Sequence, residues 1–112
     1  MVDIEADGPI PGDYSMISLG AVIVEPGLAR SFHAELRPIS ERWDPAALKV
    51  SGHTREATLG FEAPQPVMER FEGWVTRECP DRRIFISDNN GFDWSFINYY
   101  FHRFAGANFG WQ

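Results

Sequence analysis

The chain has 112 residues, enough for one domain with a modest core. Its apolar residues (44%) and aromatic residues (14%) exclude a disordered chain. The net charge of −6 argues against a basic surface for long duplex nucleic acid, and the single cysteine, Cys79, excludes an intrachain disulfide and a cysteine-based zinc site.

The first strand is predicted at residues 1–5, where Asp3 and Glu5 alternate with Val2 and Ile4. Alternation places the two carboxylates on one face, about 6–7 Å apart. Two like charges that close repel each other unless a cation lies between them, and a divalent metal accepts oxygen ligands. The alternative is a strand end with two solvated acids.

Two further strands follow a loop rich in glycine and proline at residues 6–13. Residues 14–24 are mostly apolar and β-branched, and Pro26-Gly27 predicts a tight turn. Residues 29–37 alternate between apolar and polar side chains. Three consecutive strands predict an antiparallel meander.

The second half of the chain is predicted to be mainly helical. Asp44 followed by Pro45 is a typical helix start, and this short helix is expected to end near Gly52. A second helix is predicted at residues 63–78, a fourth strand at 83–87 and a long aromatic helix at 92–104. The order β-β-β-α-α-β-α predicts an α/β domain, a mixed sheet flanked by helices.

A second carboxylate stretch lies between the fourth predicted strand and the last helix. Asn89 and Phe92 precede Asp93, which falls in the first turn of that helix. An aspartate there is also ordinary, because it complements the helix dipole and caps free N–H groups.

Together, the two stretches resemble the DEDD superfamily of 3′→5′ exonucleases. Asp3-Ile4-Glu5 resembles the first exonuclease motif, and Asn89-x-x-Phe92-Asp93 resembles the second. Residues 16–22 are similar to the family's second strand, and residues 50–54 are similar to the turn after its short helix. The resemblance covers nearly the whole chain and is closest to ribonuclease T and the proofreading subunit of bacterial DNA polymerase III. It implies a ribonuclease H-like fold.

The resemblance also implies a two-metal-ion hydrolysis that releases nucleoside 5′-monophosphates from single-stranded DNA or RNA 3′ ends. Asp3 would bridge two Mg²⁺ or Mn²⁺ ions, Glu5 would bind the ion on the nucleophile side, and Asp93 the ion on the leaving-group side. The expected substrate-binding residues near the terminal nucleotide are Ala6, Asp7, Gly8, Asn89 and Phe92. Ribonuclease T-type relatives dimerise, so a homodimer is compatible with this assignment.

Two departures from the family pattern matter. Asp88 stands where the family usually has His at the start of the second motif. The third motif, with a final Asp and a His or Tyr general base, has no counterpart, and residues 106–112 resemble the segment that leads toward it. Residues 1–112 are therefore expected to form a single, truncated exonuclease domain whose C-terminal part is missing.

None of the three histidines is expected to replace the missing base. His102 lies nine positions after Asp93 and therefore on the far side of the predicted helix. His33 lies on a strand without an identifiable partner, and His53 lies in a turn. Two alternatives to the exonuclease stay open: a catalytically incomplete nucleic-acid-binding or assembly module with the same fold, and a metal-dependent nuclease that cuts internally.

The cellular setting follows from two further features of the chain. A lone thiol without a signal peptide predicts a cytoplasmic protein. The longest apolar run, residues 21–24, is far too short to span a bilayer, so no membrane partner is expected.

Overall fold

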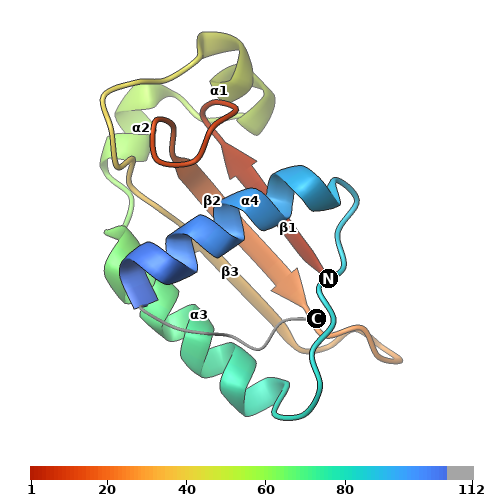
Figure 1. Ribbon diagram of the computed structural model, residues 1–112. Coiled ribbons are helices and arrows are strands. Elements are labelled where there is room, and N and C mark those ends of the chain that lie inside the picture. The colour runs from red at the N-terminus through yellow and green to blue at the C-terminus, as the bar shows by residue number, and fades with distance from the viewer. Residues whose placement is uncertain (106–112) are drawn as a thin grey trace.

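Three antiparallel strands form the sheet in the computed structural model, which describes residues 1–105 (Figure 1). They are β1 (Val2–Ala6), β2 (Met16–Val22) and β3 (Ser31–Glu35), in the spatial order β1-β2-β3. Both pairings are antiparallel, which confirms the predicted meander. The register shifts between Glu5 and Ala6, so β1 bends where its carboxylates end.

The two faces of β1 differ as the alternation predicted. Val2, Ile4 and Ala6 are buried, whereas Asp3 is exposed and Glu5 is half-buried. β3 behaves in the same way, since Ala34 is buried and its neighbours are more exposed. The sheet therefore has one apolar face against the core and one polar face that carries Asp3 and Glu5.

Two short helices follow the sheet. In α1 (Pro45–Ser51), the Asp44 carboxylate accepts a hydrogen bond from the Ala46 N–H at 3.0 Å, and Gly52 ends the helix in the left-handed region. This confirms the predicted start and end. The second helix, α2 (Arg55–Leu59), was not predicted, because five residues are too few to show a helical period. Its signal is Thr54, whose hydroxyl accepts from the Ala57 N–H at 3.1 Å.

Two longer helices, α3 (Pro64–Glu78) and α4 (Asn90–Tyr100), cover the apolar face of the sheet, and a π-helical turn, η1 (Phe101–Ala105), continues α4 (Figure 1). Both helices were predicted, but α4 begins two residues earlier than expected. The Phe71 and Phe101 rings stack at 5.5 Å where α3 meets η1. The fully buried side chains include Met16, Leu19, Leu36, Val67, Met68, Phe71, Phe96, Ile97 and Tyr100.

The predicted fourth strand at residues 83–87 does not form in the described part of the chain. This segment runs beside β1, where the Val2 N–H donates a backbone hydrogen bond to the Ile86 carbonyl at 2.8 Å. The next N–H on the same edge of β1, that of Ile4, lies close enough to the Asp93 carboxylate to lower its pKa. The Asp93 side chain therefore lies near the position where a strand ladder would continue, and the described sheet is antiparallel, not mixed.

No helix within residues 1–105 combines the length and the apolar character that a membrane crossing requires.

Candidate functional site

Asp3 and Glu5 lie in two rows of side chains that cross the polar face of the sheet. Asp3 pairs with Gly20 and then His33, while Glu5 pairs with Ser18 and then Glu35. Directly paired residues point to the same face. Because Gly20 and Ser18 are small, the two carboxylates of β1 are not covered by large cross-strand neighbours.

Asp93 reaches β1 from the first turn of α4 and is buried, with 3% of its surface exposed. Burial raises the pKa of this carboxyl group above its ordinary value, and the negative charges of Asp3 and Asp88 raise it further. The Ser87 hydroxyl and the N–H of Ile4 act in the opposite direction on the pKa. Ile4 lies directly between Asp3 and Glu5 in the sequence, so its effect on the pKa places the Asp93 side chain near the edge of β1.

Glu5 responds to the same neighbours. Burial is the main cause that raises its pKa, followed by the charges of Asp3 and Asp93. The fold thus brings the three sequence-predicted carboxylates of β1 and α4, 90 residues apart in the chain, into one electrostatic environment. A cation placed among them would relieve their mutual repulsion.

The donors fit a hard divalent cation in chemistry, since all three are carboxylates. They do not form a closed cage, because no group of three His, Cys, Asp or Glu side chains within residues 1–105 is arranged to hold a metal ion. Metal binding by these carboxylates therefore stays a prediction.

His53, which was not expected from the sequence to act as the general base, lies near the carboxylates. Its Nε2 lies 3.3 Å from Glu35 Oε2, its ring meets that of Phe61 edge-on at 5.1 Å, and its proximity lowers the pKa of Glu5. Only the cross-strand row from Glu5 to Glu35 reveals this connection, since nothing in the local sequence places a turn after α1 beside β1.

Asp7 and Gly8, both predicted to border a nucleotide, are buried. Asp7 Oδ1 accepts a hydrogen bond from the Ser15 N–H at 2.6 Å, and Asp7 Oδ2 lies 3.4 Å from Arg55. Its backbone N–H and carbonyl are also engaged, by Ser15 and Asp44. Burial raises the pKa of Asp7, while the Ser15 bond and Arg55 oppose the shift. The geometry therefore favours a supporting role for the Asp7 side chain, and contact with a nucleotide stays a prediction.

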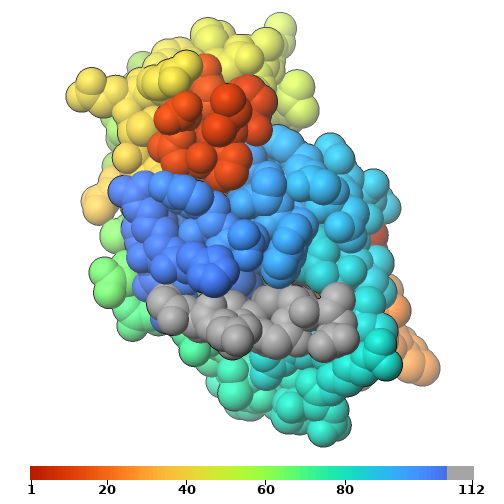
Figure 2. Space-filling model, in the orientation of Figure 1, coloured from red at the N-terminus to blue at the C-terminus, as the bar shows by residue number. Residues whose placement is uncertain are grey.

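The loop after β1 is packed closely on both sides. The Tyr14 ring lies against Gly8 so tightly that a Cβ atom at Gly8 would lie 2.0 Å from Tyr14 Cδ1. Gly12, with a φ of +94°, faces the Tyr99 hydroxyl of α4. Figure 2 shows this loop in orange-red between α4 and the yellow segment that precedes α1. Gly8 therefore has a packing role in addition to the predicted substrate role.

The remaining predicted site residues lie at the start of α4. Asn89 is the exposed residue before the helix, and its carbonyl accepts a hydrogen bond from the Asp93 N–H at 2.9 Å. Phe92 is half-buried, and its ring lies 5.1 Å from that of Phe96. Ala6 is buried at the end of β1. A base contact by Phe92 stays a prediction that competes with packing.

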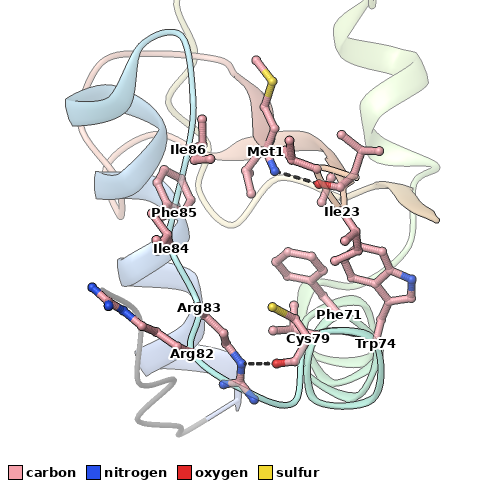
Figure 3. Close-up of a pocket in the computed structure, with 15 residues that line it drawn as sticks. Met1, Ile23, Phe71, Trp74, Cys79, Arg82, Arg83, Ile84, Phe85 and Ile86 are labelled. Carbon is pink, nitrogen blue, oxygen red and sulfur yellow. Dashed lines mark hydrogen bonds between the residues drawn. The ribbon is translucent and has the colours of Figure 1, made fainter. Parts of the chain in front are cut away.

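An apolar cavity of about 220 Å³ lies away from these carboxylates, and none of the three lines it. Figure 3 shows Phe71, Trp74 and Cys79 of the α3 end on one side and the segment Ile84–Ile86 on the other. Arg83 spans the gap and donates from Nε to the Cys79 carbonyl at 2.8 Å. The cavity thus lies outside the candidate site.

The sequence is similar to that of a 3′–5′ DNA exonuclease. The relative is the Escherichia coli protein named 3'-5' DNA exonuclease Cap18, with 44% identity over 112 residues that cover 96% of this chain. The chain spans 58% of the length of that relative. No family model matches the sequence. The similarity supports the exonuclease part of the resemblance drawn from the two carboxylate motifs.

Proposed function

We propose that the protein is a metal-dependent 3′→5′ exonuclease of the DEDD type with a ribonuclease H-like fold. It removes nucleoside 5′-monophosphates from single-stranded DNA ends. The observation that carries the proposal is that Glu5 and Asp93 lie near Asp3 with raised pKa values, mainly because of burial and further because of the Asp3 charge, in a chain similar to an exonuclease over 96% of its length. Neighbouring carboxylates with perturbed pKa values are typical of catalytic sites.

The three carboxylates are the residues that would hold two Mg²⁺ or Mn²⁺ ions. Bound ions would supply an activated water and positive charge for the leaving 3′ oxygen. Asp3 is exposed on the sheet face and is therefore open to a ligand on that side, whereas Asp93 is buried beside the Ile4 N–H. Glu5 is half-buried.

DNA is the preferred substrate because the relative is named a DNA exonuclease. RNA is the second substrate to test. The net charge of −6 favours short single-stranded ends over a long duplex track, since duplex affinity depends on many phosphate contacts. A cytoplasmic location and a homodimer remain further predictions.

The second candidate function is a binding or assembly module that keeps the fold without catalysis. It is favoured by one observation: no group of three metal-ligating side chains within residues 1–105 is arranged to hold an ion. Such a module would retain single strands without shortening them.

The test is a cleavage assay with 5′-labelled single-stranded DNA and RNA, in Mn²⁺ and in chelator. A metal-dependent ladder that shortens from the 3′ end is expected. An internal cut would support an endonuclease in place of the proposed exonuclease. A mobility shift without loss of length would support the binding module.

The test variant is Asp3→Asn, which keeps the size of the side chain and removes its charge, and the control variant is Asp81→Asn. Asp3→Asn should abolish the ladder, whereas Asp81→Asn, in the exposed loop after α3, should leave it unchanged. If Asp3→Asn cleaves at the rate of the unmodified protein, the metal site is assigned to the wrong residues.

A further inference from the structure

A groove on the outer surface of α1 and α2 has the composition of a single-strand binding site. The lining residues are Trp43, Pro45, Leu48, Lys49, His53, Thr54, Arg55 and Glu56. Trp43 is a large aromatic residue with 39% of its surface exposed. An exposed tryptophan at the mouth of a groove offers a flat face on which a base can stack.

Arg55 holds the Trp43 ring in place. Its guanidinium lies 5.9 Å from the centre of the ring, and its Nη2 donates to the Ser40 carbonyl at 3.0 Å. The other end of the guanidinium faces the buried Asp7. Because Arg55 is fixed on the protein side, the ring of Trp43 is supported there while much of its surface remains exposed.

Lys49 supplies positive charge to the groove. It lies in the last turn of α1 and forms no ion pair with any of residues 1–105. Glu56 is the one acid among these eight lining residues. An unpaired lysine beside an exposed tryptophan matches the alternation of phosphate and base along a single strand.

His53 connects the groove to the carboxylates. It lines the groove, and its Nε2 lies 3.3 Å from Glu35, which belongs to the same cross-strand row as Glu5. A strand end at Asp3 and Glu5 would therefore have the nucleotides upstream of it within reach of α1.

We propose that this groove binds single-stranded DNA upstream of the reacting 3′ end, with a base stacked on Trp43 and a backbone phosphate paired with Lys49. The inference rests on the proposed exonuclease function and adds to it the path of the substrate. Binding through this groove requires no metal, so it can be measured separately from cleavage.

The experiment measures fluorescence anisotropy of a 5′-labelled twelve-residue oligothymidylate in chelator. Trp43→Ala should weaken binding about ten-fold, whereas Trp43→Phe, which keeps an aromatic face, should stay within about three-fold of the unmodified protein. Lys49→Gln should weaken binding and reduce the slope of log affinity against log salt by about one. The matched control is Arg77→Gln on α3, which changes the net charge equally and should bind normally.

An abasic oligomer of the same length separates stacking from charge. Trp43→Ala should bind it as the unmodified protein does, because there is no base to stack, while Lys49→Gln should still bind it more weakly. The inference is overturned if Trp43→Ala and Lys49→Gln bind oligothymidylate like the unmodified protein, if Arg77→Gln weakens binding as much as Lys49→Gln, or if the unmodified protein does not bind.

The two proposals fail in different ways. If the Trp43 and Lys49 variants cleave with Mn²⁺ as the unmodified protein does, the proposed binding groove is refuted and the proposed exonuclease function stands. If binding depends on Trp43 and no metal-dependent cleavage occurs, the proposed binding groove stands and the proposed exonuclease function is refuted. Unfolding midpoints of all variants, measured by circular dichroism, show whether a loss of binding is a loss of fold.

Discussion

The hydroxyl of Tyr100 accepts a hydrogen bond from the backbone N–H of Met16 at 2.8 Å, across 84 positions of the chain. Both residues are fully buried, and burial raises the pKa of Tyr100. This bond ties the last turn of α4 to the start of β2. Asp93 lies in the first turn of α4, near Ile4 of β1, so the same helix is bonded to β2 at one end and lies at the other end beside β1, which carries Asp3 and Glu5.

Tyr100→Phe should therefore destabilise the protein. The substitution keeps the ring and leaves the Met16 N–H buried without its partner, which costs about 1–3 kcal/mol of the free energy of unfolding. Urea denaturation followed by circular dichroism measures the change.

Tyr99→Phe is the matched control. The Tyr99 hydroxyl accepts a hydrogen bond from Arg103 at the surface, so its loss should cost less than about 0.5 kcal/mol. Equal costs for the two substitutions would show that the Met16 bond does not hold α4 on the sheet.

The local parts of this arrangement could be predicted from the sequence. The alternation of apolar and acidic residues predicted that Asp3 and Glu5 lie on one face of β1. The Asp44-Pro45 pair predicted the start of α1, and the apolar stripe predicted α3. These features depend on neighbours within one or two turns, which a sequence displays directly. The association of Asp93 with Asp3 and Glu5 followed from a family resemblance, because no local rule connects residues 90 positions apart.

Three features escaped prediction for one physical reason, which is that long-range contacts override local preference. Residues 83–87 have a strand-like composition, yet the Asp93 carboxylate lies beside the Ile4 N–H that a further strand would need. His53 approaches Glu5 only through the pairing of three strands. The burial of Asp7 against Ser15 and Arg55 was not visible in the sequence, and its contact with a nucleotide stays a prediction.

Gly8→Ala should destabilise the loop after β1. The added Cβ would lie 2.0 Å from the Tyr14 ring, and overpacking of this kind costs about 1–3 kcal/mol or more. A double-mutant cycle identifies the cause: in a Tyr14→Ala background, Gly8→Ala should cost much less, because the clashing ring is gone. If the cost is equal in both backgrounds, the Tyr14 contact is not what requires glycine. The unfolding free energy of the four proteins decides this.

Asp93→Asn should change the pH dependence of stability. Since the folded pKa of Asp93 is raised above its ordinary value of 3.8, the folded chain holds this proton more tightly than the unfolded chain. The stability that the folded chain gains from this proton is fully present below pH 3.8 and is lost as the pH rises through the folded pKa of Asp93. In chelator, the unmodified protein should therefore lose stability relative to Asp93→Asn as the pH rises from below 3.8 through the raised pKa of Asp93.

The sign of this effect is reinforced by Glu5. Its pKa is raised by burial and then by the charges of Asp3 and Asp93, so neutralising Asp93 also relieves Glu5. Urea midpoints at several pH values give the difference curve. Asp81→Asn, which removes an exposed carboxylate from the loop after α3, should give a much flatter curve. If the unmodified protein instead gains stability relative to Asp93→Asn as the pH rises, the raised pKa of Asp93 is contradicted.

Mn²⁺ should stabilise the protein through the same three carboxylates. An ion that binds only the folded chain adds about 2.7 kcal/mol at one hundred times its dissociation constant, and it also removes the repulsion that raises the pKa values of Glu5 and Asp93. The unfolding temperature should rise with Mn²⁺ concentration and return to its original value when the metal is chelated.

The triple variant Asp3→Asn, Glu5→Gln, Asp93→Asn should show no rise, whereas Glu56→Gln should respond like the unmodified protein. An equal rise in the triple variant would place the ion elsewhere. Because no three ligating side chains within residues 1–105 are arranged to hold an ion, a rise that needs millimolar Mn²⁺ is the expected result.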